Sequence, residues 1–232
     1  MAGSLKFPLA SDRQPGLVFY SAELSDLDEI CEFLLIHFFP EVPIAKVVSM
    51  DVDKEVRPWV RKFVGAIVSD SNSIIVRDAQ HNNRLAAVRL NIVELKGVDN
   101  EKFHLTKYCN PVDHPLMWMN AAFLDQLAQG VDCYEMFGVD KIFYLVLVSV
   151  SNEYGRRGIA AKLVELSIEM AKQKGLHVST ASAVNEFAAK ALGAAGFKSV
   201  KQLAYSDFEF NGSRPLVNSG VHQIGRLMAM NF

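Results

Sequence analysis

The stretch that decides the fold is LVSVSNEYGRRGIA, residues 147–160. It overlaps the nearly unbroken apolar run 142–150, which is typical of a strand covered on both faces of a sheet. In the segment 159–174 apolar residues recur at helical spacing until Gly175, a residue suited to a left-handed helix stop. The sequence therefore predicts a central strand, a short turn and a helix.

The turn inside this stretch suits an anion. Backbone amides at a helix N-terminus have no carbonyl partner, and the helix dipole also favours negative charge there. Gly155 and Gly158 allow close approach of the backbone, while Arg156 and Arg157 add positive charge. A diphosphate fits such a turn, although the same sequence is also compatible with a plain surface turn that has solvated arginines. A Rossmann dinucleotide turn is disfavoured, because its third glycine is missing and the turn follows antiparallel strands.

Strands and helices share the rest of the chain. β-branched runs and turn residues predict further strands at 17–22 (as an edge strand), 73–78, 85–95, 178–181, 200–210 and 225–231, which makes seven in all. Apolar periodicity predicts helices at 25–39, 52–68, 116–129 and 186–195. Ser25 is the expected N-cap of the first helix, which Pro40 and Pro43 should end, and Asn185 is the expected N-cap of the last.

Composition and charge narrow the class of protein. A length of 232 residues favours one elaborated domain, and a formal charge of -2 offers no basic field for nucleic acid. No apolar run is long enough for a membrane span, so no membrane association and a cytoplasmic location are expected. The three cysteines, Cys31, Cys109 and Cys133, form no C-x-x-C pair, so neither a disulfide framework nor a metal site is expected.

The stretch 147–160 resembles motif A of the Gcn5-related N-acetyltransferases (GNATs), whose pattern is L-x-V-x-P-x-Y-R-G-x-G-I-A or similar. Agreement is found at Val148, Val150, Tyr154, Gly158, Ile159 and Ala160. The family's next motif, N-x-x-A and a small helix ending in G-F, is matched by Asn185, Ala188, Gly196 and Phe197. The resemblance implies an α/β (α+β) GNAT fold: a mixed, mostly antiparallel central sheet of about seven strands, flanked by helices and splayed at the central strand. It also implies a single N-acetyltransferase domain over 1–232, with an insertion at about 97–140.

Further segments resemble the invertebrate-type arylalkylamine N-acetyltransferases. They are FGVDK at 137–141, YSDF at 205–208, Pro215 with His222, and FFPEVPI at 38–44, which is similar to that branch's F-F-x-D-E-P-L box. The likeness extends from about residue 17 to 230. It implies acetyl transfer from acetyl-CoA to the primary amine of a small molecule, with arylalkylamines as candidate substrates.

The resemblance also implies which residues bind acetyl-CoA. In the family, the main chain of the central strand pairs with pantetheine and the turn amides bind the pyrophosphate. These roles fall on Val148, Ser149, Val150, Arg156, Arg157, Gly158, Ile159, Ala160 and Ala161, with Asn185 as a further contact. The family's usual Arg or Gln is replaced by Gly155; because the amides do most of the binding, cofactor binding is expected to survive.

The proton-transfer groups depart from the family pattern. The glutamate of D-E-P-L corresponds to Val42, so Glu41 is the candidate general base, directly or through water; its alternative reading is a solvated acid at a helix end. The family's tyrosine and serine in the last helix correspond to Leu192 and Ala188. The replacement candidates are Ser149, Tyr205 and His222, each equally open to a purely structural role.

Three functions remain open on the sequence alone. The first is N-acetylation of a small primary amine, for which Phe38, Phe39, Trp118 and Phe187 offer an aromatic pocket or simply core packing. The second is acyl-CoA binding without turnover, suggested by the lost polar groups. The third, acetylation of proteins or peptides, is disfavoured because the insertion at 97–130 would wall the acceptor cleft. The oligomeric state and the identity of the amine are not indicated.

Overall fold

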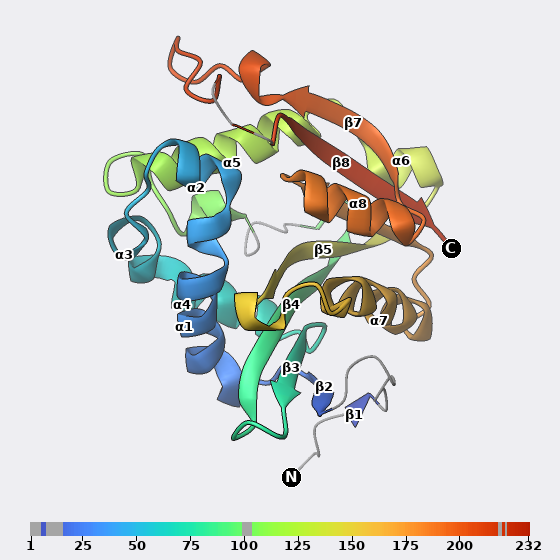
Figure 1. The fold of residues 1–232 in the computed structure, drawn as a ribbon. Helices are drawn as coiled ribbons and strands as arrows, with labels where there is room; N and C mark the ends of the chain where they lie inside the picture. Colours follow the sequence, from blue (N-terminus) through green and yellow to red (C-terminus); the bar gives the residue numbers. More distant parts are fainter. Residues whose placement is uncertain (1–5, 8–15, 99–103, 218–219, 221) are drawn as a thin grey trace.

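The computed structural model describes residues 6–7, 16–98, 104–217, 220 and 222–232. Its eight strands form one sheet in the order β1-β2-β3-β4-β5-β6-β8-β7 (Figure 1). The strands are β1 (Lys6–Phe7), β2 (Leu17–Ser21), β3 (Ile74–Asp78), β4 (Arg84–Leu95), β5 (Lys141–Val150), β6 (Val178–Ala183), β7 (Lys198–Ala204) and β8 (Ile224–Asn231). Among the described strands only β5 and β6 pair in parallel; the other neighbours are antiparallel. The predicted mixed, mostly antiparallel sheet is confirmed, with one short strand more than expected.

The sheet opens between its two parallel strands. β5 and β6 are in register only from Phe143 to Leu145, which face Ser179 to Ala181. β5 continues to Val150 and β6 to Ala183, so the strands separate beyond the last pair. The predicted splay at the central strand is therefore present.

Helices cover both faces of the sheet (Figure 1). On one face, α1 (Leu27–His37) and α4 (Arg57–Val68) pack on alternate residues of β3 and β4. On the other face, α7 (Ile159–Gln173) and α8 (Glu186–Ala194) bury their apolar sides. A third apolar cluster joins α5 (Pro115–Ala128) to β8. The shorter helices are α2 (Pro43–Val47), α3 (Val52–Glu55) and α6 (Cys133–Phe137).

Most predicted elements are confirmed, and five predictions are corrected. The strand at 17–22 is not an edge, because β2 pairs with β1 as well as with β3. The predicted N-cap Ser25 lies inside a 3-10 helix, Leu24–Asp26, and the capping box is formed by Glu23 and Asp26. Pro43 was expected to end the first helix, but it is the first residue of α2. At that position the missing N–H of proline costs no hydrogen bond.

The other two corrections concern broken elements. The helix expected at 52–68 is split at Val56, since α3 ends at Glu55 and α4 starts at Arg57 with a proline in its first turn. The strand expected at 200–210 ends at Ala204 and continues as a 3-10 helix, Tyr205–Asp207. Part of the segment at 97–140 (99–103) lies outside the described residues; the rest holds α5 and α6.

Glu55, the last residue of α3, places α5. Its carboxylate is buried and accepts hydrogen bonds from the amides of Leu116 (3.1 Å) and Met117 (3.2 Å), in the first turn of α5. A carboxylate is favoured at the positive end of a helix dipole, and it satisfies amide donors that have no carbonyl partner. This contact therefore ties α3 to the N-terminus of α5.

We predict that Glu55→Ala lowers the free energy of unfolding by about 1–3 kcal/mol, because it leaves two amide donors of α5 without an acceptor. Chemical denaturation measures this loss. Glu169→Ala is the matched control, since Glu169 is exposed on α7 and its loss should stay within about 0.5 kcal/mol. Equal losses in the two variants would contradict the capping role.

Candidate active site

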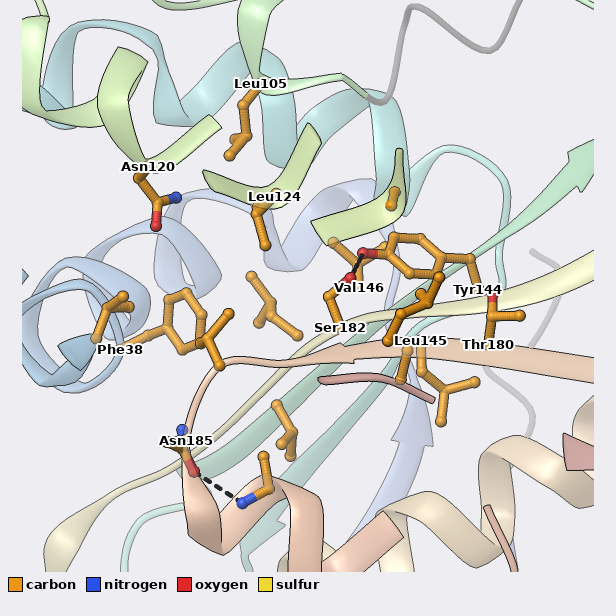
Figure 2. A pocket seen from close by; sticks show the side chains of 18 of the residues that line it. Phe38, Leu105, Asn120, Leu124, Tyr144, Leu145, Val146, Thr180, Ser182 and Asn185 are labelled. Carbon is orange, nitrogen blue, oxygen red and sulfur yellow. Dashed lines mark hydrogen bonds between the residues drawn. The ribbon is translucent and has the colours of Figure 1, made fainter. Parts of the chain in front are cut away.

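A cavity of about 860 Å³ runs through the opening of the sheet. At one end it is lined by Val148, Val150, Ala160, Val164, Asn185 and Leu192, from β5, α7 and the α8 region. At the other end it is lined by residues of α2, α4, α5 and β4 and of the segments that connect the helices, among them Phe38, Glu41, Glu94, Leu105 and Leu124. Figure 2 shows this second end, with Leu105, Asn120 and Leu124 above, Phe38 at the left, and Tyr144 and Val146 of β5 at the right. We call the two ends the α7 end and the acceptor end.

The turn before α7 has the geometry of an anion site. Gly158 is the N-cap of α7 and has a left-handed backbone with φ +77, while Arg156 also has a positive φ of 60. Within the described chain, the amides of residues 158–161 donate to no backbone carbonyl. A Cβ on Gly158 would meet no atom within 4 Å, so the space above the turn is open.

Tyr154 holds this turn against the β3–β4 hairpin. Its hydroxyl donates to Asp78 Oδ2 at 2.9 Å, and its ring lies between the guanidinium groups of Arg84 and Arg157, each 5.5 Å from the ring centroid. Burial raises the pKa of Tyr154, so the phenol stays protonated and keeps donating. Arg157 is therefore partly engaged by packing, whereas Arg156 is exposed.

The α8 side of the cavity is fixed by a helix cap. Asn185 Oδ1 accepts a hydrogen bond from the amide of Ala188 at 2.7 Å, as Figure 2 shows, which confirms the predicted N-cap. His222 lines the cavity next to it; its Nδ1 accepts from the amide of Glu186 at 3.5 Å, and its ring contacts Phe187 with centroids 5.5 Å apart. Asn185 and His222 thus border the same space.

The predicted catalytic residues fall into two groups. Glu41 and His222 both line the cavity, and Glu41 Oε2 is paired with Lys46 Nζ at 2.5 Å. Ser149 and Tyr205 are not among the lining residues. The Ser149 hydroxyl donates to the carbonyl of His37 at 3.1 Å, and the Tyr205 hydroxyl donates to the carbonyl of Val184.

Tyr205 and Ser149 are therefore engaged by the backbone. Burial raises the pKa of Tyr205 far above its usual range, and its ring packs on Phe123 at 4.8 Å. This geometry gives no support to a catalytic role for either hydroxyl. Of the aromatic residues predicted for the pocket, Phe38, Phe39 and Phe187 line it, while Trp118 packs against the core of α1 and α4.

Glu94, Arg89 and Tyr144 are among the polar residues of the cavity that were not predicted. Glu94 and Arg89 lie on β4, and Tyr144 on β5 donates to Ser182 Oγ at 3.2 Å across the two parallel strands. Burial raises the pKa of Glu94 to about 7 and that of Tyr144 to about 12. The available signal was a charged residue inside an otherwise apolar strand, which is rare in a core without a partner.

Arg89 is the most buried charge of the cavity wall. It is 3% exposed, and its Nε donates to Asn91 Oδ1 at 3.0 Å. The side-chain Nδ2 of Asn91 in turn donates to Ser167 Oγ on α7 at 3.1 Å, so Arg89 lies on the α7 face of the sheet. Desolvation lowers the pKa of Arg89 to about 9.

The described residues hold no cluster of His, Cys, Asp and Glu able to bind a metal ion. All three cysteines are buried and free, and burial raises the pKa of Cys31 and Cys109 to about 11. Among the helices of the described ranges, none has the length and apolar character needed to cross a membrane.

Comparisons with known proteins agree with this geometry. Residues 96–197 match the model of the Acetyltransferase (GNAT) family, a range that includes the α7 turn and α8. The fold is similar to arylalkylamine N-acetyltransferase 2 from Aedes aegypti, with a TM-score of 0.82 and 24% identity over 93% of this chain and 98% of that chain. It is similar to polyamine N-acetyltransferase from Drosophila melanogaster, with a TM-score of 0.77 and 15% identity over 93% and 100% of the two chains.

A third similar structure is Arabidopsis thaliana NAA60 in complex with acetyl-CoA, with a TM-score of 0.53 and 14% identity over 93% and 99% of the two chains. No curated protein sequence matches the chain. Residues 96–197 therefore match the Acetyltransferase (GNAT) family model, and 93% of the chain shares the fold of these N-acetyltransferase structures.

Proposed function

We propose that this protein transfers an acetyl group from acetyl-CoA to the primary amine of a small molecule. The observation that carries the proposal is the single cavity, which connects the unpaired edge of β5 and the N-terminus of α7 to an apolar acceptor end. Similar folds bear names that fit this reaction: an arylalkylamine and a polyamine N-acetyltransferase, and a complex with acetyl-CoA.

The residues of the α7 end suit coenzyme A. The amides of residues 158–161 are oriented as at any helix start and have no backbone acceptor in the described chain, so they would hold the diphosphate. Val148 and Val150 lie beyond the last β5–β6 pair, so their strand edge would pair with the amides of pantetheine. Arg156, Ala160, Ala161 and Asn185 would complete the contacts.

The chain's own residues would then position and deprotonate the amine. Bound acetyl-CoA supplies an activated thioester. Direct attack needs a neutral amine, a donor for the developing oxyanion and a proton for the sulfur. Open amides of β5 beyond Leu145 are our candidates for the oxyanion donor, and the apolar walls would exclude water.

Two side chains are our candidates for proton transfer. Because Lys46 occupies Oε2 of Glu41, we assign the role of proton acceptor to Oε1, directly or through water. The Nδ1 atom of His222 accepts a hydrogen bond from the amide of Glu186, which leaves Nε2 as the ring nitrogen that could donate a hydrogen bond to the departing sulfur.

A second candidate function is acyl-CoA binding without turnover. Val42 and Leu192 line the cavity at the places where relatives carry a glutamate and a tyrosine, and neither can transfer a proton. Acetylation of a protein chain is less favoured, because α5 walls the acceptor end with Asn120, Ala121 and Leu124.

We predict that Gly158→Ala weakens coenzyme A binding at least tenfold, because the new Cβ enters the space above the amides. Calorimetric titration with coenzyme A measures this change. Gly175→Ala at the opposite end of α7 is the matched control: it also has a positive φ (71) and open space around it, so the backbone strain is similar. Equal affinities of the two variants would remove the support for a diphosphate site at this turn.

We predict that Glu41→Gln lowers kcat/KM for the best amine by about 10²- to 10⁴-fold, the usual contribution of general acid–base catalysis. Affinity for coenzyme A should change little, since Glu41 lies at the acceptor end. Glu169→Gln on the exposed face of α7 serves as the control. A variant within threefold of the native rate, with an unaltered pH profile, would exclude Glu41 as the base.

A further inference from the structure

Glu94 is a carboxylate that faces the acceptor end, with no compensating charge among the residues that the structure describes. On β4, Val93 packs in the cluster of the α7 face, so its neighbour Glu94 projects to the opposite face, where α5 and α6 lie. It lines the cavity and is partly buried. In the described part of the chain its carboxylate forms neither a hydrogen bond nor an ion pair.

The groups around Glu94 cannot neutralise it. The ionisable groups that feel its charge are Cys133, Tyr134 and Tyr144. Burial raises the pKa of all three, to about 12 for the two tyrosines, so they are uncharged near pH 7. Arg89 points to the other face of the same strand.

The other described charges of the acceptor end are also negative or already paired. Asp125 and Asp132 line the same end, and burial raises the pKa of Asp125. Lys46 is paired with Glu41, and His104 lies beside Asp125. A desolvated carboxylate is unfavourable until a cation or hydrogen-bond donors accompany it. The cavity therefore favours a positively charged group at this end.

Strand register gives the distance between Glu94 and the acetyl site. Glu94 is in register with Ile142 of β5, and the unpaired edge of β5 begins at Val146. Four residues along a strand span about 13 Å at about 3.3 Å per residue. Allowing about 3 Å for contact at each end, the two ends of a bound substrate would be about 7–10 Å apart.

The walls between these two points are apolar. Phe38, Leu105 and Leu124 surround this part of the cavity (Figure 2), and Ile92 lies on the same strand as Glu94. Such walls suit a chain of methylene groups, whose transfer from water is favourable. A neutral aromatic group would also fill the space, but it would leave Glu94 without a partner.

We propose that the amine substrate carries a second positive charge, an ammonium or guanidinium group, which Glu94 binds while the primary amine reaches the open edge of β5. The inference rests on the proposed function and names its substrate class: aliphatic diamines or aminoalkyl guanidines with five to seven bonds between the charged groups and the reacting nitrogen.

Thiol release from acetyl-CoA tests this preference with 1,6-diaminohexane, agmatine, hexylamine and 2-phenylethylamine. The native protein should show a kcat/KM at least tenfold higher for the diamine than for hexylamine, which differs only by the second charge. In Glu94→Gln this ratio should fall at least tenfold, mostly through KM, and Glu94→Asp should recover part of it. Glu169→Gln should keep the native ratio.

Three outcomes would overturn the inference: hexylamine used as well as the diamine, a ratio unchanged in Glu94→Gln, or an equal loss for both amines. If no amine is acetylated, the proposed function fails. Calorimetric titration of the coenzyme A complex with 1,6-diaminohexane then decides on Glu94, because diamine binding that Glu94→Gln does not weaken contradicts the inference on its own.

The melting temperature gives a readout without substrate. The pKa of Glu94 is raised in the folded state. Between about pH 4.5 and about pH 7 its carboxyl group is therefore ionised mainly in the unfolded state, and the native protein should lose stability as the pH rises through this range. Glu94→Gln should therefore melt higher than the native protein at pH 8.5, with a much smaller difference at pH 5. Adding 1,6-diaminohexane at pH 8.5 should raise the melting temperature of the native protein more than that of the variant. An equal rise in both would count against the proposed contact.

Discussion

The separation of β5 from β6 after three residue pairs is the constraint on which the site depends. A parallel pair that continued to Val150 would use its own backbone groups for the ladder and would leave no space between α7 and α8. Instead the hydroxyl of Tyr144 bridges to Ser182 just where the strands part. Beyond that bridge β6 ends at Ala183, and Asn185 turns the chain into α8. An interior strand thus gains an open edge, and backbone donors on such an edge need a partner.

The neighbouring strand β4 carries two charged residues in the wall of the cavity. Arg89 and Glu94 lie five residues apart on β4, on opposite faces. Desolvation lowers the pKa of Arg89 and raises that of Glu94, which favours the neutral form of each. The two side chains form no ion pair with each other, because they project from opposite faces of β4. Replacing both by apolar residues would be expected to stabilise an empty fold, because buried charges without partners are costly. Their presence in the wall of a cavity therefore favours a role in ligand binding over a role in folding.

Local signals explain what was predictable. The apolar run of β5, the glycines of the turn and the periodicity of α7 are properties of a few consecutive residues, and they gave the centre of the fold and the anion site. What depended on distant partners was missed. β2 is interior only because β1 pairs with it, Glu55 accepts hydrogen bonds from a helix about 60 residues later in the chain, and the strand at 198–204 ends where Tyr205 bonds Val184. Side-chain direction has the same origin: Ser149 points to α1, away from the cavity.

The acceptor end shows why the polar residues of a site are harder to foresee than its backbone. A glutamate in β4 has no distinctive spacing, and its pKa of about 7 arises from the helices that cover it, 40 residues later in the chain. Glu41, by contrast, was found from its position in a motif, yet it lies paired with Lys46 in an exposed turn. The two carboxylates therefore differ in solvation, as acids with different tasks do. A desolvated carboxylate gains most from a cationic ligand, whereas Glu41 is exposed and already paired with Lys46, and this difference favours Glu94 over Glu41 as the site of charge recognition.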